Sequence, residues 1–340
     1  MGVPRAADAK RLKTLLTGKK VLFLAHTRPD LDTLASAYAL SLFFAPYSKT
    51  TFGIPDPLNT VSALLQPFQI KPKTISSLAS YDAVVCVDFR SPQQGGSLSH
   101  ALSTYPKTLI LIDHHSTALH SFSRKTIPII RPHSIATAQM VTRIGRAMKA
   151  SFPSTLATLL ATAILADSAR FAVANPHTFE TFDFLLQKSP KTYEELLLLA
   201  FPPPPTGNRL ALFKAARAAK IFTVGDYLLA FIHAPYHTAF AASSFIQLGA
   251  DLAVGYARDP HHILCSIRVS EKLHHDLDLD ILDIILPFAQ QHDGDAGGHA
   301  RAAQLNIPAY MTEETLIDLF TKQLLMRIRA QGKHAHIRLH

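Results

Sequence analysis

The fold of this chain is decided by residues 21–40, which read VLFLAHTRPDLDTLASAYAL. The stretch opens with an apolar run, Val21 to Ala25, and a short run of this kind that ends abruptly in polar residues is typical of a buried parallel strand. Polar and charged residues follow from His26 to Asp32, and the spacing of apolar residues from Thr33 to Leu40 is that of a helix. The stretch therefore predicts a strand, a tight turn with an imidazole and two carboxylates, and a helix.

Two further apolar runs repeat the pattern of a strand that ends in an acidic residue. Ala83 to Val87 precedes Asp88, and Thr108 to Ile112 precedes Asp113. Helical patterns separate and follow these runs, an alternation that favours an α/β fold built on a parallel sheet. The polar residues after the strands would then meet at the carboxyl edge of the sheet, which is where open sheets bind ligands.

A fourth acidic position, Asp167, follows the second of two helices expected at 135–150 and 154–166. Together with the residues after the three strands, it would bring several carboxylates and imidazoles to one place. Crowded carboxylates repel one another unless cations neutralise them, and oxygen-rich ligands with imidazole suit Mn²⁺ or Mg²⁺. Pairs of divalent ions are typical of hydrolases that act on phosphate esters, so the pattern indicates a two-metal hydrolase.

The composition fits a folded chain of two domains. The chain has 340 residues, of which 48% are hydrophobic and 17% charged, a balance that excludes disorder. The net charge is +9, but residues 1–20 and 321–340 each carry +5, and basic ends are commonly solvated. The presence of only two cysteines, with no signal peptide and no apolar stretch of about 20 residues, predicts a cytoplasmic protein without a membrane partner.

Consecutive prolines, Pro202 to Pro205, mark the expected domain boundary, because proline lacks a backbone donor and favours extended chain. We expect residues 201–208 to be neither helix nor central strand. The predicted division is a catalytic domain at 1–195, a linker at 196–212 and a smaller α/β domain at 213–340. Within the smaller domain the expected elements are strands at 227–234, 250–256 and 263–269 and a helix at 279–291.

The polar residues of the first domain resemble the four motifs of the DHH phosphoesterase superfamily. These motifs are His26-x-x-x-Asp30-x-Asp32, Asp88, Asp113-His114-His115 and Asp167. The segment Gly297-Gly298-His299-Ala300-Arg301-Ala302-Ala303 is similar to the GGHxxAA signature of the DHHA1 domain that follows in that superfamily. The resemblance implies a DHH domain, a smaller C-terminal DHHA1 domain and an active-site cleft between them.

The resemblance also implies roles for the motif residues. His26 and Asp30 would hold one divalent cation, and Asp88 would bridge it to a second cation. The remaining ligands of the second cation would be Asp32, His114 and Asp167. Catalysis would rest on Asp88, on His115 beside the substrate phosphate, and on Asp113, which would orient a ligand histidine. The expected metal is Mn²⁺, with Mg²⁺ or Co²⁺ as alternatives.

Substrate binding is expected to draw largely on the second domain. The residues that the resemblance implies are His115, Arg268, Gly297, Gly298 and His299. The two glycines, expected in a loop, would let the backbone approach an anion closely. The strand Cys265 to Ser270 resembles the SxR strand of DHHA1, which makes Arg268 a candidate phosphate ligand.

Taken together, the sequence favours two-metal hydrolysis of phosphodiester or phosphomonoester bonds in short oligonucleotides or small nucleotides. The activity would be similar to that of RecJ-related nanoRNases and of phosphatases of 3′-phosphoadenosine-5′-phosphate (pAp). Leu31 stands where relatives often carry glycine, which puts substrate choice in doubt but removes no ligand. Two alternatives stay open: a family II-type inorganic pyrophosphatase, and a non-catalytic nucleic-acid or replication scaffold of the same fold. The sequence also leaves open whether the chain forms a homodimer.

Overall fold

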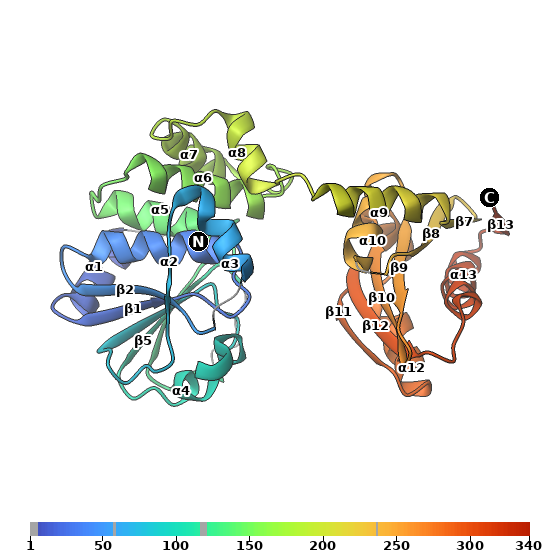
Figure 1. Ribbon diagram of the computed structural model, residues 1–340, viewed down its shortest axis with the longest axis horizontal. Helices are drawn as coiled ribbons and strands as arrows, with labels where there is room; N and C mark the ends of the chain where they lie inside the picture. The colour runs from blue at the N-terminus through green and yellow to red at the C-terminus, as the bar shows by residue number, and fades with distance from the viewer. Residues whose placement is uncertain (1–5, 57–58, 116–120, 236) are drawn as a thin grey trace. The chain divides into compact units, whose positions relative to one another are not determined.

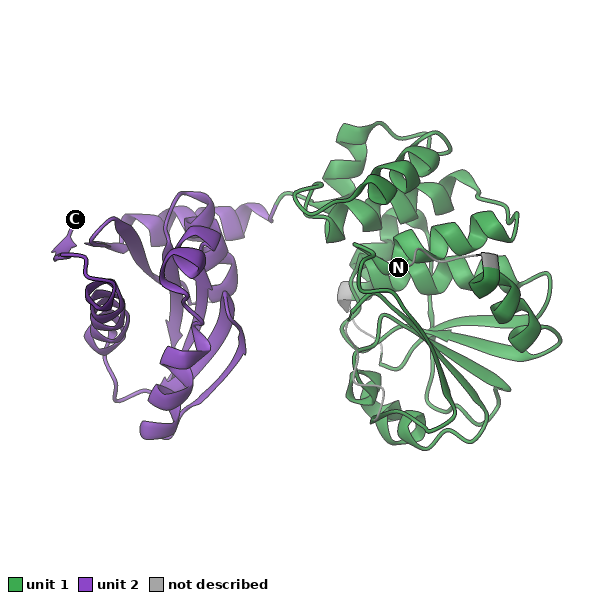
Figure 2. Cartoon of the chain, turned by 180° about the vertical axis from the view of Figure 1, so that it is seen from behind, with its two compact units in different colours: residues 1–203 green, residues 204–340 purple. Residues whose placement is uncertain are grey.

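The computed structural model divides into two compact units. It describes residues 6–56, 59–115, 121–235 and 237–340. Unit 1 comprises residues 1–203 and unit 2 residues 204–340 (Figure 2). Each unit has its own sheet and its own hydrophobic core, so each is described by itself.

Unit 1 is built on a parallel sheet. Its described residues form six strands in the order β3-β2-β1-β4-β5-β6, and every neighbouring pair is parallel (Figure 1). The strands are β1 (Lys20–Leu24), β2 (Lys49–Ile54), β3 (Lys73–Thr74), β4 (Ala83–Val87), β5 (Thr108–Asp113) and β6 (Thr126–Ile130). The three strands predicted from apolar runs are β1, β4 and β5, which lie side by side. The α/β fold class with an N-terminal parallel sheet is thereby confirmed.

Apolar side chains of this sheet are buried on both faces, which explains why its central strands are continuous apolar runs. Phe23 and Val85 belong to the core on one face with α2, α5 and α6, whereas Leu22 and Val84 belong to the core on the other face. The predicted helices at 135–150 and 154–166 are confirmed as α5 and α6. The helices of unit 1 are α1 (Ala6–Leu16), α2 (Leu31–Phe44), α3 (Asn59–Leu65), α4 (Ser99–Ser103), α5 (Thr137–Ala147), α6 (Ser154–Asp167), α7 (Pro176–Leu186) and α8 (Tyr193–Ala200), with 3₁₀ segments η1 (Gln66–Phe68) and η2 (Pro92–Leu98).

Unit 2 carries a mixed sheet. Its described residues form seven strands in the order β11-β12-β10-β9-β8-β7-β13, in which only β8 and β9 pair in parallel. The strands are β7 (Lys220–Val224), β8 (Tyr227–His233), β9 (Leu252–Arg258), β10 (His262–Val269), β11 (Asp295–His299), β12 (Ala302–Pro308) and β13 (Ile337–Leu339). The helices are α9 (Thr206–Arg217), α10 (Thr238–Gln247), α11 (Glu271–Leu277), α12 (Leu282–Gln291) and α13 (Glu313–Ala330). The strands expected at 227–234, 250–256 and 263–269 are confirmed as β8, β9 and β10, and the helix expected at 279–291 is confirmed as α12.

Two expectations about local structure are wrong. Residues 201–208 were expected outside any helix, but α9 begins at Thr206; the boundary between the two units, after residue 203, falls within the segment expected as a linker. Pro205 is the N-cap of α9, since proline is tolerated where the first helical N–H groups have no partner. The segment from Gly297 to His299, expected in a loop, belongs to edge strand β11, which pairs with β12 alone.

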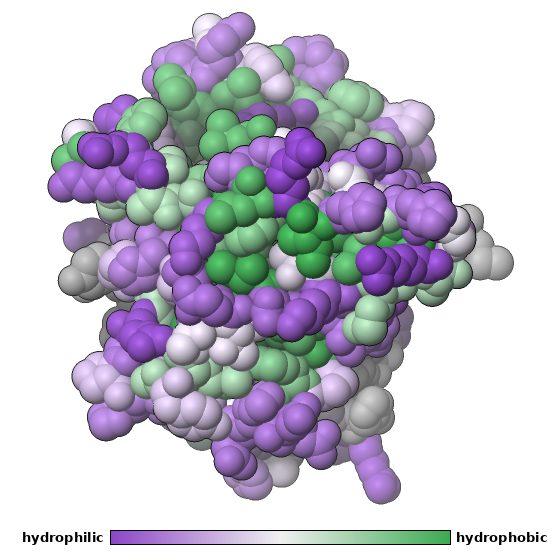
Figure 3. All heavy atoms as spheres, turned by 90° about the vertical axis from the view of Figure 1, so that its right-hand side faces the viewer, coloured by the Kyte–Doolittle hydropathy of each residue, from purple (hydrophilic) through white to green (hydrophobic). Residues whose placement is uncertain are grey.

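The surface of unit 2 exposes some apolar side chains near the end of the chain. Met326 is 54% exposed, Ile337 41% and Leu339 60%. On the face that Figure 3 presents, apolar groups lie among polar ones, and scattered apolar side chains are ordinary on folded domains. Among the described residues, we find no helix that combines the length and the apolar character needed to cross a membrane.

Candidate metal centre

The first motif lies in the turn between β1 and α2. Asp30 is the N-cap of α2, and its Oδ1 accepts hydrogen bonds from the backbone N–H of Thr33 at 2.9 Å and from Thr33 Oγ1 at 3.1 Å. Asp32, in the first turn, is only 1% exposed. Its carboxylate accepts the backbone N–H groups of Thr137 at 2.8 Å and Ala138 at 2.7 Å. The positive end of α5 therefore holds a buried carboxylate in place.

Asp88 directly follows β4 and makes hydrogen bonds to residues of β5, α2 and α5. Its φ of 63° lies in the left-handed region, which aspartate tolerates better than most residues. Its backbone N–H donates to the carbonyl of Ile112 in β5 at 2.8 Å. Its buried carboxylate accepts hydrogen bonds from Thr33 Oγ1 at 2.8 Å and from Thr137 Oγ1 at 3.3 Å. The side chain is thereby fixed between α2 and α5.

The third motif, Asp113-His114-His115, lies at the end of β5. Asp113 is fully buried, and its Oδ1 accepts hydrogen bonds from the backbone N–H and from Nδ1 of His115, both at 2.9 Å. His114 Nδ1 lies 3.2 Å from the carbonyl oxygen of Ser134. Its other nitrogen, Nε2, lies 3.4 Å from Oδ2 of Asp167, the last residue of α6. Asp113 and Ser134 thus set the orientation of the two imidazoles.

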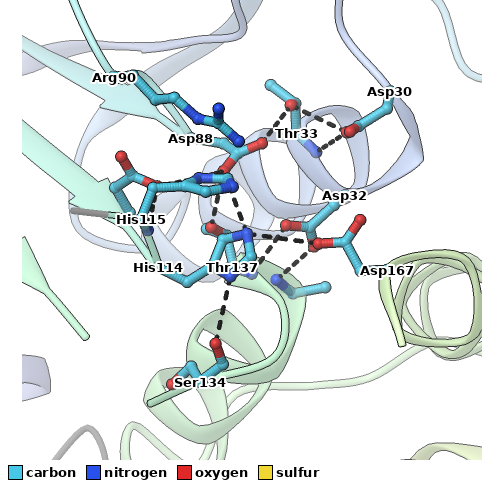
Figure 4. Close-up of polar contacts among 12 residues, drawn as sticks. Asp30, Asp32, Thr33, Asp88, Arg90, His114, His115, Ser134, Thr137 and Asp167 are labelled. Atoms are coloured by element: carbon cyan, nitrogen blue, oxygen red, sulfur yellow. Dashed lines mark hydrogen bonds and ion pairs between the residues drawn. The ribbon is translucent and has the colours of Figure 1, made fainter. Parts of the chain in front are cut away.

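These contacts bring the predicted site residues of unit 1 together, as Figure 4 shows for most of them. Two sets of three residues have ligand atoms within 4.8 Å of one another. The sets are Asp88, His114 and His115, and Asp32, His114 and Asp167. The remaining predicted ligands, His26 and Asp30, contact the cluster through Thr33.

Burial and mutual repulsion raise the pKa values of two carboxyl groups in the cluster. Burial raises the pKa of Asp32, and the charges of Asp167, Asp88 and Asp30 raise it further. Burial also raises the pKa of Asp167, which reaches about 7 with the added repulsion of Asp30 and Asp88. Ionising both groups in the folded protein therefore requires compensating positive charge.

His115 and Asp88 form an ion pair within the cluster, so the charge of His115 balances Asp88 rather than Asp32 and Asp167. Hydrogen bonds to Asp113 and Asp88 raise the pKa of His115 to about 9 despite its burial. Burial works to raise the pKa of Asp88, but hydrogen bonds from His115 and Thr33 outweigh it, so this pKa falls below its ordinary value. At neutral pH His115 is therefore positively charged and Asp88 negatively charged.

The surroundings of His114 fit a bound cation. Burial and the charge of His115 lower its pKa, so the ring is neutral near pH 7. With Nδ1–H donated to the Ser134 carbonyl, the lone pair lies on Nε2. That atom is buried and has no hydrogen-bond partner among the described residues, although it lies 3.4 Å from Asp167 Oδ2 and 3.8 Å from Asp88 Oδ1. A lone pair that faces two carboxylates is unfavourable unless a cation lies among them, so the donor set suits a divalent metal.

Comparison with known proteins agrees with this arrangement. The family model for the DHH family, N-terminal domain, matches residues 20–164, a range that includes the first three motifs and most of α6, the helix that ends at Asp167. Residues 20–164, which make up most of unit 1, therefore form a DHH-family N-terminal domain. A sequence relative, an uncharacterized protein of Methanocaldococcus jannaschii, is 24% identical over 296 residues, or 85% of this chain and 87% of the relative.

Two solved structures are similar to this chain over most of its length. An exopolyphosphatase-related protein from Bacteroides fragilis superposes with a TM-score of 0.72 at 18% identity, covering 98% of this chain and 100% of the other. RecJ from Thermus thermophilus, solved in complex with Mg²⁺, gives a TM-score of 0.47 at 12% identity, covering 95% of this chain and 52% of RecJ. The first of these shows that the fold is shared across both units.

The substrate-binding residues expected in the second domain lie in unit 2, on neighbouring strands. Ala302 of β12 pairs with Arg268 of β10 on one side and with His299 of β11 on the other. Directly paired residues project to the same face of a sheet, so the arginine and the histidine lie in one row. Gly298 has φ +145°, and a Cβ there would lie 2.5 Å from the Ala302 carbonyl oxygen, whereas a Cβ at Gly297 would meet nothing within 4 Å. Of these two glycines, only Gly298 is required by the backbone of this unit.

Four residues of the DHH site were not predicted from the sequence. Thr33 and Thr137 bond the carboxylates, Ser134 orients His114, and Arg90 points toward Asp88 (Figure 4). The spacing of Asp30 and Thr33 is that of a helix cap, so the sequence contained a signal for Thr33, but one that every capped helix shares. The other three come from different elements, and nothing in their local sequence marks them.

Proposed function

We propose that this DHH protein is a phosphoesterase that uses two divalent cations, preferably Mn²⁺, to hydrolyse phosphate ester bonds in short oligonucleotides or small nucleotides. The observation that supports it most is the buried Nε2 of His114, whose lone pair faces the carboxylates of Asp167 and Asp88. A site of this kind is costly to fold without positive charge. Such a site in unit 1 therefore favours bound divalent cations.

Each cation is assigned a set of ligands. His26 and Asp30 would hold the first cation, and Asp32, His114 and Asp167 would hold the second. Asp88, between α2 and α5, would contribute to both. When bound, such a pair supplies Lewis acidity and makes hydroxide available from water at neutral pH.

The protein's own groups would orient and stabilise the reacting phosphate. His115, with a pKa of about 9, stays protonated at neutral pH and places a positive charge next to Asp88. Asp113 holds this imidazole through two hydrogen bonds of 2.9 Å, so the ring needs no reorganisation when charge develops on phosphate. We therefore assign Asp88, His115 and Asp113 to catalysis.

Unit 2 would contribute the substrate grip, in keeping with a DHHA1 role. Arg268 and His299 share one row of the sheet, and a guanidinium and an imidazole together suit a phosphate group. Gly297 and Gly298 leave the backbone of β11 accessible, because both are exposed on an edge strand. The two free, buried cysteines, Cys86 and Cys265, fit a reducing compartment, and we propose the cytoplasm.

A substrate panel tests the proposal. Protein treated with EDTA is assayed with and without Mn²⁺ on pyrophosphate, pAp, cyclic dinucleotides, and RNA and DNA from 2 to about 20 nucleotides long. We expect no turnover without metal, and turnover of pAp or of the shortest oligonucleotides with it. Turnover of pyrophosphate alone would instead indicate an inorganic pyrophosphatase. Inactivity on every substrate, with Mn²⁺ bound, would indicate a scaffold.

A further inference from the structure

The hydroxyl of Thr33 lies where three proposed ligands of the first cation converge. Thr33 Oγ1 is 2.8 Å from Asp88 Oδ2, 3.0 Å from His26 Nε2 and 3.1 Å from Asp30 Oδ1. These three residues come from the segments after β1 and β4 and from the N-cap of α2. Figure 4 shows the hydroxyl between the carboxylates of Asp88 and Asp30. One neutral side chain thus lies within hydrogen-bonding distance of all three ligands that we assign to the first cation.

One hydroxyl cannot satisfy all three of these ligands at the same time. A threonine hydroxyl has one proton to donate, so it can satisfy Asp88 or Asp30 at a given moment, but not both. A neutral imidazole ring has a single nitrogen lone pair, and His26 Nε2 lies 3.0 Å from the Thr33 hydroxyl. A cation bound at His26 Nε2 needs the lone pair of that nitrogen. When Nε2 instead carries a hydrogen and donates it to Thr33, the lone pair is not available and the cation cannot bind there.

We propose that the Thr33 hydroxyl competes with the first cation for His26, Asp30 and Asp88, so that this site binds metal more weakly than the site of Asp32, His114 and Asp167. This inference rests on the proposed function, since it presupposes a cation at each site. It makes metal loading sequential, with the second site filled first. The first cation then binds only when Thr33 gives up its hydrogen bonds.

The helix provides a route for the hydroxyl to move. Threonine in a helix populates two χ1 rotamers, because Oγ1 can also bond to the carbonyl three or four residues earlier. Thr33 lies in the first turn of α2, so rotation would exchange the ligand contacts for a bond to the backbone carbonyl of the N-cap residue, three positions earlier. At the second site the Thr137 hydroxyl contacts one assigned ligand, Asp88, at the longer distance of 3.3 Å, whereas Thr33 lies within 3.1 Å of three ligands of the first site.

The Thr33→Val variant of the full chain separates competition from simple support of the ligands. Valine keeps the shape of threonine and removes the hydroxyl. If Thr33 competes, Mn²⁺ should bind the first site about 3- to 10-fold more tightly, which is the range expected for the loss of one competing hydrogen bond. If Thr33 instead orients the ligands, or is itself a ligand, the same variant should bind Mn²⁺ more weakly at the first site.

Two further variants serve as controls. Thr33→Ser keeps the hydroxyl and should bind Mn²⁺ like the unmodified protein. Thr181→Val removes a buried helical hydroxyl that bonds only the carbonyl of His177, at 2.7 Å, and should leave both affinities unchanged. Free Mn²⁺ is measured by electron paramagnetic resonance during titration, which requires no turnover.

Thermal unfolding gives a second measurement on the same proteins. Without metal, Thr33→Val should unfold at a lower temperature than the unmodified chain, because the buried carboxylate of Asp88 loses a donor. Saturating Mn²⁺ should narrow that difference in unfolding temperature, because a ligand that binds the folded state more tightly stabilises it more. Unchanged or weaker first-site binding in Thr33→Val would overturn this inference alone. Absence of Mn²⁺ binding by the unmodified chain would overturn the proposed function and the inference together.

Discussion

Replacing Asp167 with asparagine should stabilise the protein without metal and weaken its response to Mn²⁺. In the folded protein, burial and the charges of Asp30 and Asp88 raise the pKa of Asp167 to about 7, against an ordinary value of 3.8. The folded state therefore holds this proton more tightly than the unfolded chain, and the free energy of unfolding falls as pH rises between these values. At 1.36 kcal/mol per pH unit, ionisation of Asp167 lowers the free energy of unfolding by up to about 4 kcal/mol above pH 7, and it has no effect below about pH 4.

Hydrogen-exchange mass spectrometry can measure this effect in each unit separately. We compare Asp167→Asn with the unmodified chain at about pH 8 in EDTA, following the buried strands β4 and β5. The variant should show greater protection there and unchanged protection in β8 to β10 of unit 2. The difference should shrink to less than half at about pH 5, because most Asp167 carboxyls are then protonated. Asp183→Asn, at an exposed position on α7, serves as the matched control and should change neither unit.

With saturating Mn²⁺, the unmodified chain should show greater hydrogen-exchange protection in β4 and β5 than Asp167→Asn. The unmodified chain gains binding free energy at the site of Asp32, His114 and Asp167, whereas the asparagine variant has lost an anionic ligand there. Lower protection of Asp167→Asn in EDTA would refute the reasoning, because it would mean that the carboxylate stabilises the fold by itself. An equal gain from Mn²⁺ in both proteins would show that Asp167 is not a ligand.

Three other substitutions test separate parts of the account. Asp88→Asn should lower the hydrolysis rate by at least about 10³-fold, on the scale of removing a main electrostatic group; a mild loss would mean that Asp88 is not shared by the cations. His299→Ala should raise KM and leave Mn²⁺ affinity unchanged, and the opposite pattern would reject its assignment to substrate. Gly298→Ala should destabilise unit 2 by at least about 2 kcal/mol in urea unfolding, because its φ is +145° and Ala302 leaves no room. Gly297→Ala, with open space at Cβ, is its control, and equal effects would contradict the described β11.

Much of unit 1 could be predicted from the sequence because its central strands are buried on both faces. Strands β1, β4 and β5 consist of continuous apolar residues that end in polar ones, a pattern that few other structures produce. Strand β2 (Lys49–Ile54) escaped prediction because its first half is polar and partly exposed. Strand β6 carries Pro128, a residue that argues against a strand but is tolerated at the edge of a sheet.

The site was predictable where its residues follow strands, and unpredictable where they come from distant helices. Asp88 and Asp113 mark the ends of β4 and β5, and parallel strands bring such ends to one edge. Thr137 reaches the same place from the start of α5, and its two contacts depend on how that helix packs against α2. Strand β11 was expected as a loop because glycine is rare in strands, yet an edge position with one pairing partner accepts it.

Crystals of the full chain grown with Mn²⁺ give the most direct test of the central claim, through an anomalous difference map recorded at the manganese edge. We expect two peaks in unit 1, one beside His26 and Asp30 and one beside Asp32, His114 and Asp167, with Asp88 next to both. A map without a peak at His114 Nε2, from protein that hydrolyses its substrate, would contradict the account.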